Sequence, residues 1–258
     1  MNKLKEKVAL ITGSRQGLGY AIAKAFLNEG AMVVINGRNQ KEVDVAVGQL
    51  VREGFENVMG IEADVRNQSE CFFMVEKIIN KWGRVDILVN NATDSIVLNS
   101  EDVLPVDWDK TIHTNLSGSF YCSQAVAKLS MLGNKAGSII MISSILGLGG
   151  SRQRAAYCAA KHGVIGLAEA LAVEWASSNI RVNTICPSNI MTPLEMEDAL
   201  TGRCGYTIKD IENRTPLGRY STPEEQAMAC VWLASNDSSF TTGSVIKTDG
   251  GWSAYMGW

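Results

Sequence analysis

The chain has 258 residues, of which 46% are hydrophobic and 20% charged, and its formal net charge is −3. This length and apolar content suffice for one large core, so we expect a single domain over residues 1–258. A weakly acidic chain lacks the basic character that binds polyanions, which argues against nucleic acid as a partner. No run approaches the ~20 apolar residues of a membrane span, and Val8–Ile11 is too short for a signal peptide. We therefore expect a cytoplasmic protein without a membrane partner.

The cysteines and histidines argue against a metal site. Six cysteines, at positions 71, 122, 158, 186, 204 and 230, form no C-x-x-C pair, and there are two histidines. A zinc site needs ligands at close, repeated spacings, so none is expected. Scattered cysteines are typical of small, buried apolar side chains in a reducing compartment.

Short apolar runs alternate with helical patterns along the chain. Helices are predicted at Tyr20–Asn28 and Gln40–Gly54. Strands are predicted at Val8–Thr12, Met32–Asn36, Val58–Ala63, Asp86–Asn90, Gly137–Ser143 and Arg181–Cys186. This alternation predicts an α/β fold: a single-domain, Rossmann-type, doubly wound parallel sheet with helices on both faces. The pattern loses its periodicity at 188–219, which indicates a substrate-loop insertion there.

A glycine-rich turn follows the first predicted strand and precedes the first predicted helix. Its glycines, Gly13, Gly17 and Gly19, would let the backbone turn tightly and approach a pyrophosphate. The helix N-terminus would then present N–H groups to the anion. Such turns also occur for purely structural reasons, and the spacing T-G-x-x-x-G-x-G differs from G-x-G-x-x-G. The position within a strand–turn–helix–strand unit favours dinucleotide binding.

The residues after the second predicted strand bear on the choice of cofactor. A carboxylate there would accept hydrogen bonds from the adenosine ribose and indicate NAD. This chain has Asn36-Gly37-Arg38-Asn39 instead. Arg38, with Arg15 from the glycine turn, would suit a 2′-phosphate, although either arginine is also typical of a solvated surface. The pattern favours NADP(H), with NAD(H) as the alternative.

Tyr157 and Lys161 stand four residues apart, so on a helix both side chains lie on one face. A tyrosine with its ordinary pKa of about 10 is a poor base at neutral pH, and a neighbouring ammonium favours the phenolate. Such a pair often arises by chance. Ser144 strengthens the pattern, because it follows a predicted strand and could donate a hydrogen bond to a carbonyl oxygen that gains negative charge.

Across essentially its whole length the chain resembles the short-chain dehydrogenase/reductase family. The glycine turn, Asn115, Ser144, Tyr157 and Lys161 stand in family order. Further matches are Asp64-Val65, Asn90-Asn91-Ala92, Pro187 to Thr192, and Thr248-Asp249-Gly250-Gly251. The resemblance implies an enzyme that acts on CH–OH with NAD(P) as acceptor.

The resemblance also implies roles for individual residues. Tyr157 would be the general acid/base, Ser144 would polarise the substrate oxygen, and Lys161 would lower the tyrosine pKa. Lys161 would also bind the nicotinamide ribose, and Asn115 would help to hold a proton relay. The implied cofactor-binding residues are Gly13, Ser14, Arg15, Gly17, Leu18, Gly19, Arg38, Asn39, Asp64, Val65, Asn91, Tyr157, Lys161, Ile190 and Thr192.

Two positions depart from the family pattern. Thr93 follows Asn90-Asn91-Ala92 where the family usually has glycine, and Ser188 replaces the usual glycine after Pro187. Both replacements add a side chain near the expected cofactor path, and the four catalytic positions are intact. A non-catalytic cofactor-binding sensor or scaffold is the alternative from a different class, because fold alone does not establish chemistry.

The substrate and the assembly follow only from the resemblance. Within the family the chain looks most like reductases of sugar acids such as gluconate/5-ketogluconate, with 3-oxoacyl thioester reductases and hydroxysteroid dehydrogenases as alternatives. Arg152 and Arg154 could recognise an anionic group or face solvent, and the stretch Met191–Tyr206 could close over a ligand. A homotetramer or homodimer is implied. The aromatic tail from Trp252 to Trp258 would lie at a subunit contact or on its own subunit.

Overall fold

The computed structural model describes residues 2–192, 196 and 205–256. Within these ranges, seven parallel strands form one sheet with the order β3-β2-β1-β4-β5-β6-β7. The strands are β1 (Val8–Ile11), β2 (Met32–Gly37), β3 (Val58–Glu62), β4 (Ile87–Asn90), β5 (Gly137–Ile142), β6 (Ile180–Pro187) and β7 (Val245–Thr248). The strand order reverses between β1 and β4, and such a switch point opens a crevice at the carboxyl ends of the strands.

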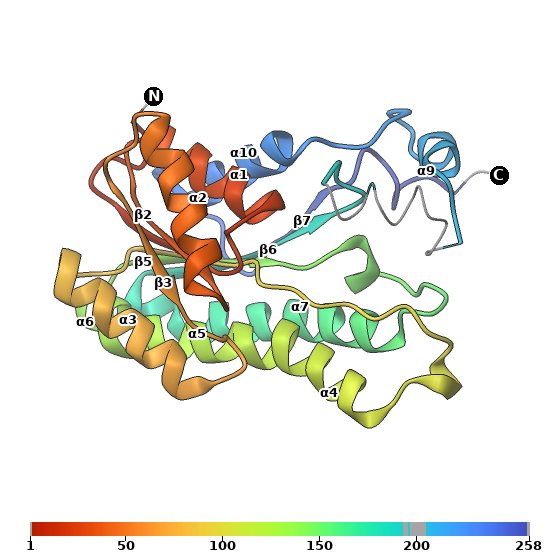
Figure 1. The fold of residues 1–258 in the computed structure, drawn as a ribbon, viewed down its shortest axis with the longest axis horizontal. Helices are drawn as coiled ribbons and strands as arrows, with labels where there is room; N and C mark the ends of the chain where they lie inside the picture. Colours follow the sequence, from red (N-terminus) through yellow and green to blue (C-terminus); the bar gives the residue numbers. More distant parts are fainter. Residues whose placement is uncertain (1, 193–195, 197–204, 257–258) are drawn as a thin grey trace.

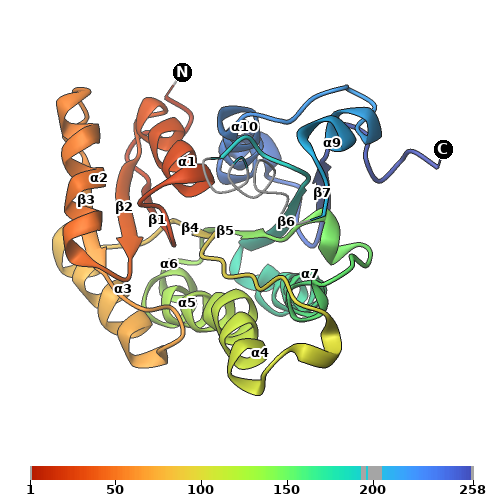
Figure 2. The same ribbon diagram turned by 45° about the vertical axis from the view of Figure 1, so that its right-hand side comes forward.

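Helices cover both faces of the sheet (Figures 1 and 2). One layer holds α1 (Gly17–Asn28), α2 (Gln40–Arg52) and α10 (Pro223–Ala234). The other holds α3 (Gln68–Trp82), α4 (Pro105–Ile112), α5 (Gly118–Val126), α6 (Leu132–Asn134) and α7 (Ala155–Trp175). Two π-helical segments, His113–Ser117 and Ala127–Met131, join α4, α5 and α6. The short helix α9 (Ile208–Arg214) lies near the C-terminus.

Each face of the sheet has its own hydrophobic core. Successive side chains of β1 alternate between them: Val8 and Leu10 belong to one core, and Ala9 and Ile11 to the other. Because both faces are covered, all four residues are buried, which explains why this strand reads as a continuous apolar run. The predicted fold class, a doubly wound parallel sheet with helices on both faces, is confirmed.

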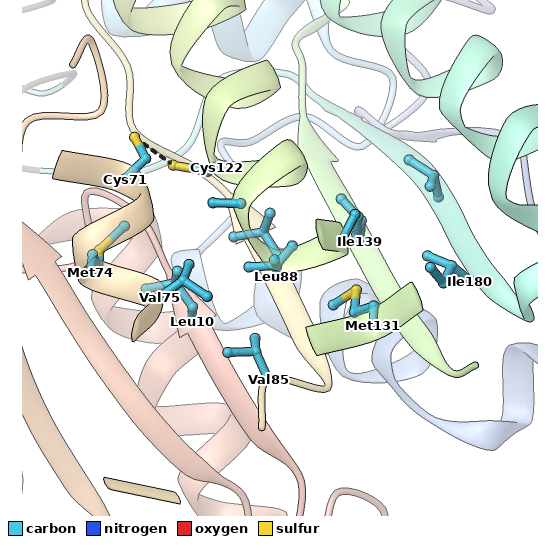
Figure 3. Close-up of a cluster of buried hydrophobic side chains, with 14 of the residues drawn as sticks. Leu10, Cys71, Met74, Val75, Val85, Leu88, Cys122, Met131, Ile139 and Ile180 are labelled. Carbon is cyan, nitrogen blue, oxygen red and sulfur yellow. Dashed lines mark hydrogen bonds between the residues drawn. The ribbon is translucent and has the colours of Figure 1, made fainter. Parts of the chain in front are cut away.

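Figure 3 shows the core under α3 and α5, where Cys71 and Cys122 face each other. Their sulfur atoms are 3.5 Å apart and both residues are fully buried. The hydrogen bond to Cys71, together with burial, raises the pKa of the Cys122 thiol. The prediction of buried apolar cysteines is confirmed for Cys71, Cys122, Cys186 and Cys230, Cys158 is half-buried, and Cys204 lies outside the described residues.

Two of the elements for which the sequence analysis gave no range show which signal was lacking. The first, β7, is an edge strand whose partly exposed residues form no continuous apolar run. The second, α9, lies within 188–219, where we predicted no regular structure. A reciprocal pair of capping hydrogen bonds between Thr207 and Asp210 begins this helix. Residues 193–195 and 197–204, which include most of the predicted closing stretch, lie outside the described residues.

The C-terminal tail contacts its own subunit. The Arg214 guanidinium, at the end of α9, lies 5.0 Å from the ring centroid of Trp252 and 5.2 Å from that of Tyr255. It also donates hydrogen bonds to the main-chain oxygens of both residues, at 3.4 and 3.2 Å. Of the two places considered for the aromatic tail, these contacts support its own subunit. Residues 257 and 258 lie outside the described residues.

Candidate active site

The predicted site residues gather at the carboxyl ends of the central strands. The glycine turn follows β1, Asn91 follows β4, and Ser144 follows β5 by two residues. Parallel strands bring these ends to one edge of the sheet, on either side of the switch point between β1 and β4. Residues far apart in the sequence therefore meet in one crevice.

Asn91 holds the glycine turn in shape. Its Nδ2 donates to the main-chain oxygens of Thr12 and Gly13, at 2.9 and 3.1 Å. A Cβ atom added at Gly19 would lie 2.5 Å from that Nδ2 and 2.7 Å from the Gly13 oxygen. The turn thus requires glycine for close packing, and the Asn91 side chain lies beneath it as a brace.

Asn36 and Ser14 form a second brace, which the sequence analysis missed. The Asn36 Oδ1 accepts from the Gly13 N–H at 3.2 Å, and the main chains of Asn36 and Ser14 pair at 2.9 Å. The Ser14 hydroxyl is fully buried and donates to the Ile11 oxygen at 2.7 Å. Ser14 as a whole is buried, so it stabilises the turn from inside, and its predicted role as a cofactor contact is limited to shaping the turn.

The N-terminus of α1 fits an anionic group. Its first residue, Gly17, follows Gln16, whose side chain makes no capping hydrogen bond, and the first turn holds no acidic residue. By contrast, α2, α3 and α10 are capped by the side chains of Asn39, Asn67 and Thr222. The first N–H groups of α1 are therefore available to a pyrophosphate. This uncapped N-terminus, next to the glycine turn, is compatible with the pyrophosphate of a dinucleotide.

Two arginines flank the end of β2. The Arg15 Nε lies 3.1 Å from Glu42 Oε2, and its Nη1 donates to Gln16 at 3.0 Å. The hydrogen-bonded ion pair with Arg66 lowers the pKa of the Asp64 carboxyl, and the charge of Arg38 makes a smaller contribution in the same direction. The Asn39 side chain accepts from the Glu42 N–H at 3.3 Å and begins α2. A contact between the Asn39 side chain and a cofactor, as predicted, would therefore compete with this capping hydrogen bond.

Tyr157 and Lys161 lie on the first two turns of α7. The Lys161 ammonium is 5.4 Å from the Tyr157 ring centroid and donates to the Ile142 oxygen at 2.8 Å. Lys161 is only 2% exposed, and burial lowers its pKa from 10.5 to about 8. A charged group so costly to bury is typical of a functional site.

Ser144 begins a short 3₁₀ turn, Ile145–Gly147, and its oxygen accepts from the Leu146 N–H at 3.1 Å. The hydroxyl proton remains available for donation to a substrate oxygen. A Cβ atom at Gly147 would lie 2.8 Å from the Lys161 main-chain oxygen, so this turn packs directly on α7. Ser144 and the helix that carries Tyr157 are thereby held together.

Asn115 lies in the π-helical segment between α4 and α5. Its Nδ2 donates to the main-chain oxygens of Asp94 and Thr111, at 2.7 and 2.9 Å. The Thr93 hydroxyl donates to its Oδ1 at 2.8 Å. Thr93, noted in the sequence only as a departure from glycine, therefore contacts a predicted catalytic residue. A single sequence carries no signal for this contact.

The segment after β6 lies opposite the glycine turn. Ile190 forms a parallel bridge with Ser221, and the Thr192 N–H donates to the Ile190 oxygen at 2.7 Å. A Cβ atom at Gly17 would lie 3.7 Å from the Thr192 methyl carbon. Thr192 therefore lies beside the glycine turn, and its contact with a cofactor stays a prediction.

Within the described ranges, no helix combines the length and the apolar character of a membrane span. In the same ranges, no cluster of three or more His, Cys, Asp or Glu side chains is arranged to hold a metal ion.

The doubly wound sheet and its glycine turn define the class of dinucleotide-binding α/β proteins, and comparisons with known proteins narrow it. The family model described as enoyl-(acyl carrier protein) reductase matches residues 13–253. The chain is 39% identical over 254 residues to (2S)-[(R)-hydroxy(phenyl)methyl]succinyl-CoA dehydrogenase subunit BbsD of Thauera aromatica, covering 98% of this chain and 99% of that protein. It is 38% identical over 253 residues to 3-oxoacyl-[acyl-carrier-protein] reductase FabG of Thermotoga maritima, covering 96% and 98%.

The structure of a gluconate 5-dehydrogenase from Burkholderia cenocepacia in complex with NADP and tartrate is similar with a TM-score of 0.92 and 30% identity, covering 99% of this chain and 98% of that one. The chain therefore belongs to the short-chain dehydrogenase/reductase family. It is an oxidoreductase for small molecules that acts on CH–OH or ketone groups with NAD(P), and the reading as a non-catalytic sensor or scaffold is set aside.

Proposed function

We propose that this enzyme interconverts a secondary alcohol and a ketone, with NADP(H) preferred over NAD(H). The observation that carries the proposal is the buried Lys161 ammonium, which lies 5.4 Å from the Tyr157 ring centroid and donates to the main-chain oxygen of Ile142, two residues before Ser144. A positive charge at this place favours the phenolate form of Tyr157. The pair thereby gains a group that can exchange a proton near neutral pH.

The residues divide the chemistry between them. The Tyr157 hydroxyl gives a proton to the ketone oxygen, or takes one from the alcohol, as general acid/base. The Ser144 hydroxyl donates a hydrogen bond to the same oxygen, and Lys161 holds the charge that tunes Tyr157. Asn115 supports the proton relay. When bound, the nicotinamide supplies or accepts the hydride.

The cofactor would lie along the carboxyl edge of the sheet. We assign the pyrophosphate to the glycine turn and the α1 N-terminus, and the 2′-phosphate to Arg38 and Arg15. Residues assigned to the remaining contacts are Ser14, Leu18, Asn39, Asp64, Val65, Asn91, Ile190 and Thr192. Support for NADP(H) comes from the absence of a carboxylate at 36–39 and from the NADP named in the structure of a relative.

For the substrate we propose a keto-sugar acid, because one of the similar structures is named as a gluconate 5-dehydrogenase. A 3-oxoacyl thioester is the second candidate, favoured by the higher identity to proteins named for acyl thioester substrates. Segment 188–219 would form the substrate loop of this one domain. The cytoplasm remains the expected location.

The decisive experiment is a screen of keto-sugar acids, 3-oxoacyl thioesters and ketosteroids, following NADPH absorbance with the wild type and Tyr157→Phe. We expect one class to be turned over, and the variant to lose at least ~10³-fold in kcat while binding NADPH normally. Unchanged turnover in Tyr157→Phe would contradict the mechanism. A loss of NADPH affinity in Arg38→Ala that spares NADH is expected, and equal losses would contradict the 2′-phosphate assignment.

A homotetramer or homodimer is also proposed. Several large apolar side chains on α4 and α10 and in the tail are exposed, and such patches favour subunit contacts. These residues are Val106, Trp108, Met228, Trp232 and Met256. Sedimentation equilibrium of the wild type should give a mass of two or four chains, and a monomer would contradict the proposal.

A further inference from the structure

The two arginines assigned to the 2′-phosphate have different electrostatic surroundings. The side chain of Arg15 crosses the end of β2, with its Cδ 3.5 Å from the position of a Cβ atom at Gly37. From there its Nε reaches the Glu42 carboxylate at 3.1 Å. Glu42 is the only acidic residue in the first turn of α2, the helix that begins beside Arg38. The positive charge of Arg15 is therefore offset by a carboxylate at the phosphate site.

Among the residues that the structure describes, Arg38 forms no such ion pair with a carboxylate. The acidic group near it is Asp64, and both carboxylate oxygens of Asp64 accept hydrogen bonds from Arg66. That ion pair already compensates the Asp64 charge, so Arg38 keeps most of its attraction for an anion. The two arginines therefore differ: a phosphate that approaches Arg15 encounters the negative charge of Glu42, whereas the carboxylate near Arg38 is already paired with Arg66.

We propose that Glu42 is a specificity-determining residue whose carboxylate competes with the cofactor 2′-phosphate for Arg15. The inference rests on the proposed use of NADP(H). The side chains of Arg15 and Glu42 are 37% and 51% exposed, and ion pairs with such exposure contribute little stability, so the guanidinium can exchange partners. A phosphate bound to this guanidinium lies close to the carboxylate and is repelled by it.

The consequence concerns the ratio of the two cofactors. To bind Arg15, the 2′-phosphate of NADPH has to displace the Glu42 carboxylate or share the guanidinium with it. The repulsion between phosphate and carboxylate weakens the binding of NADPH. NADH carries no 2′-phosphate, so the Arg15–Glu42 pair stays intact when it binds. Glu42 thus weakens NADPH binding selectively and keeps NADH usable.

The test is the affinity of the full-length enzyme for NADPH and for NADH in wild type and Glu42→Gln, measured by calorimetry at low and high salt. The glutamine keeps the size of the side chain and a hydrogen-bond acceptor for Arg15, and it removes the charge. We expect NADPH to bind about fivefold more tightly at low salt and NADH to be unchanged. The gain should shrink at high salt, because the pair is exposed.

Glu53→Gln is the matched control. Glu53 caps the opposite end of α2, where it pairs with Lys24 at 2.7 Å, so the substitution changes the net charge equally but away from the site. It should leave both affinities unchanged. In the Arg15→Ala background, Glu42→Gln should no longer tighten NADPH binding, because the competition needs the guanidinium.

Three results would overturn the inference: unchanged NADPH affinity in Glu42→Gln, an equal gain in the control, or a selective loss of NADH affinity. The last would show that Glu42 binds the ribose hydroxyls instead. Arg38→Ala separates this inference from the proposed function. If it loses NADPH affinity selectively while Glu42→Gln changes nothing, the NADP(H) proposal holds and the role of Glu42 fails.

Discussion

The Thr93 hydroxyl donates a 2.8 Å hydrogen bond to Oδ1 of Asn115, which lies 22 residues further along the chain. Together with the two bonds from Nδ2 to the oxygens of Asp94 and Thr111, it engages both ends of the Asn115 amide. Asn115 is 1% exposed, whereas Thr93 is exposed to solvent. Through these hydrogen bonds, the Asn115 amide connects the segment after β4 to the π-helical segment His113–Ser117, which packs beside α7.

Replacing Thr93 by Val tests the hydrogen bond between Thr93 and Asn115. Valine keeps the shape of threonine and removes the donor, so Asn115 Oδ1 loses a partner while buried. We expect a destabilisation of about 1–2 kcal/mol in urea unfolding, together with a lower kcat. Thr93→Ser keeps the hydroxyl and should stay close to the wild type. Equal behaviour of the two variants would show that the hydrogen bond contributes nothing.

Burial of Lys161 predicts a pH-dependent gain in stability for Lys161→Met. The pKa of Lys161 is about 8 in the folded protein against an ordinary 10.5, so the ammonium lowers the free energy of unfolding at pH values below about 8. This destabilisation disappears as the pH rises from about 8 to 10.5, because in that range the unfolded chain binds the proton more strongly than the folded protein. The shift corresponds to about 3 kcal/mol, and loss of the bond to the Ile142 oxygen subtracts about 1 kcal/mol.

The cofactor-free variant should therefore be more stable than the wild type by about 2 kcal/mol at pH 7, and inactive. The difference should fall with rising pH in urea unfolding between pH 7 and pH 10. A difference that does not change with pH would show that the lysine is not desolvated as described.

Gly19→Ala should damage the cofactor site directly. The added carbon would lie 2.5 Å from Asn91 Nδ2, so the brace of the glycine turn has to move. We expect at least ~10-fold weaker binding of both NADPH and NADH, and a lower thermal midpoint. Gly166→Ala is the control: it lies on α7 with no atom within 4 Å of the new carbon, and it should stabilise the protein by about 0.5–1 kcal/mol. Normal cofactor binding by Gly19→Ala would refute the close packing of this turn.

Arg214→Ala should loosen the end of the chain. The guanidinium lies against two aromatic rings and donates to two main-chain oxygens, so it fixes both α9 and the tail. We expect faster limited proteolysis within residues 205–256 and a loss of about 1–2 kcal/mol in unfolding free energy. Arg214→Lys keeps the charge without the planar fork and should be intermediate. Proteolysis of Arg214→Ala at the wild-type rate would show that Arg214 does not hold α9 and the tail together.

The sequence predicted most of the sheet because its central strands are buried on both faces and appear as apolar runs. The apolar criterion fails for β7, which lies at the edge of the sheet and includes the exposed Lys247. It also fails for α9, where one buried residue, Ile211, gives no periodic pattern. The Thr207 and Asp210 pair was the available signal for that helix.

The candidate site was predictable where its residues lie close in sequence or match a motif. Tyr157 and Lys161 share one helix, and the glycine turn is continuous. Contacts between distant segments were not accessible, because nothing in a single sequence relates Thr93 to Asn115. The same holds for Arg15 and Glu42, whose side chains meet only because β1 and β2 are neighbours in the sheet.

The buried cysteine pair in Figure 3 provides a natural reporter of local opening. A thiol reagent reaches Cys71 or Cys122 only when α3 separates from α5, because both side chains are fully buried between these helices. Cys158, beside Tyr157 on α7, is half-buried and reacts without such an opening. The labelling rates of Cys71 and Cys122, measured separately from those of the buried Cys186 and Cys230 and compared with that of Cys158, therefore report how often α3 and α5 separate, with no residue changed.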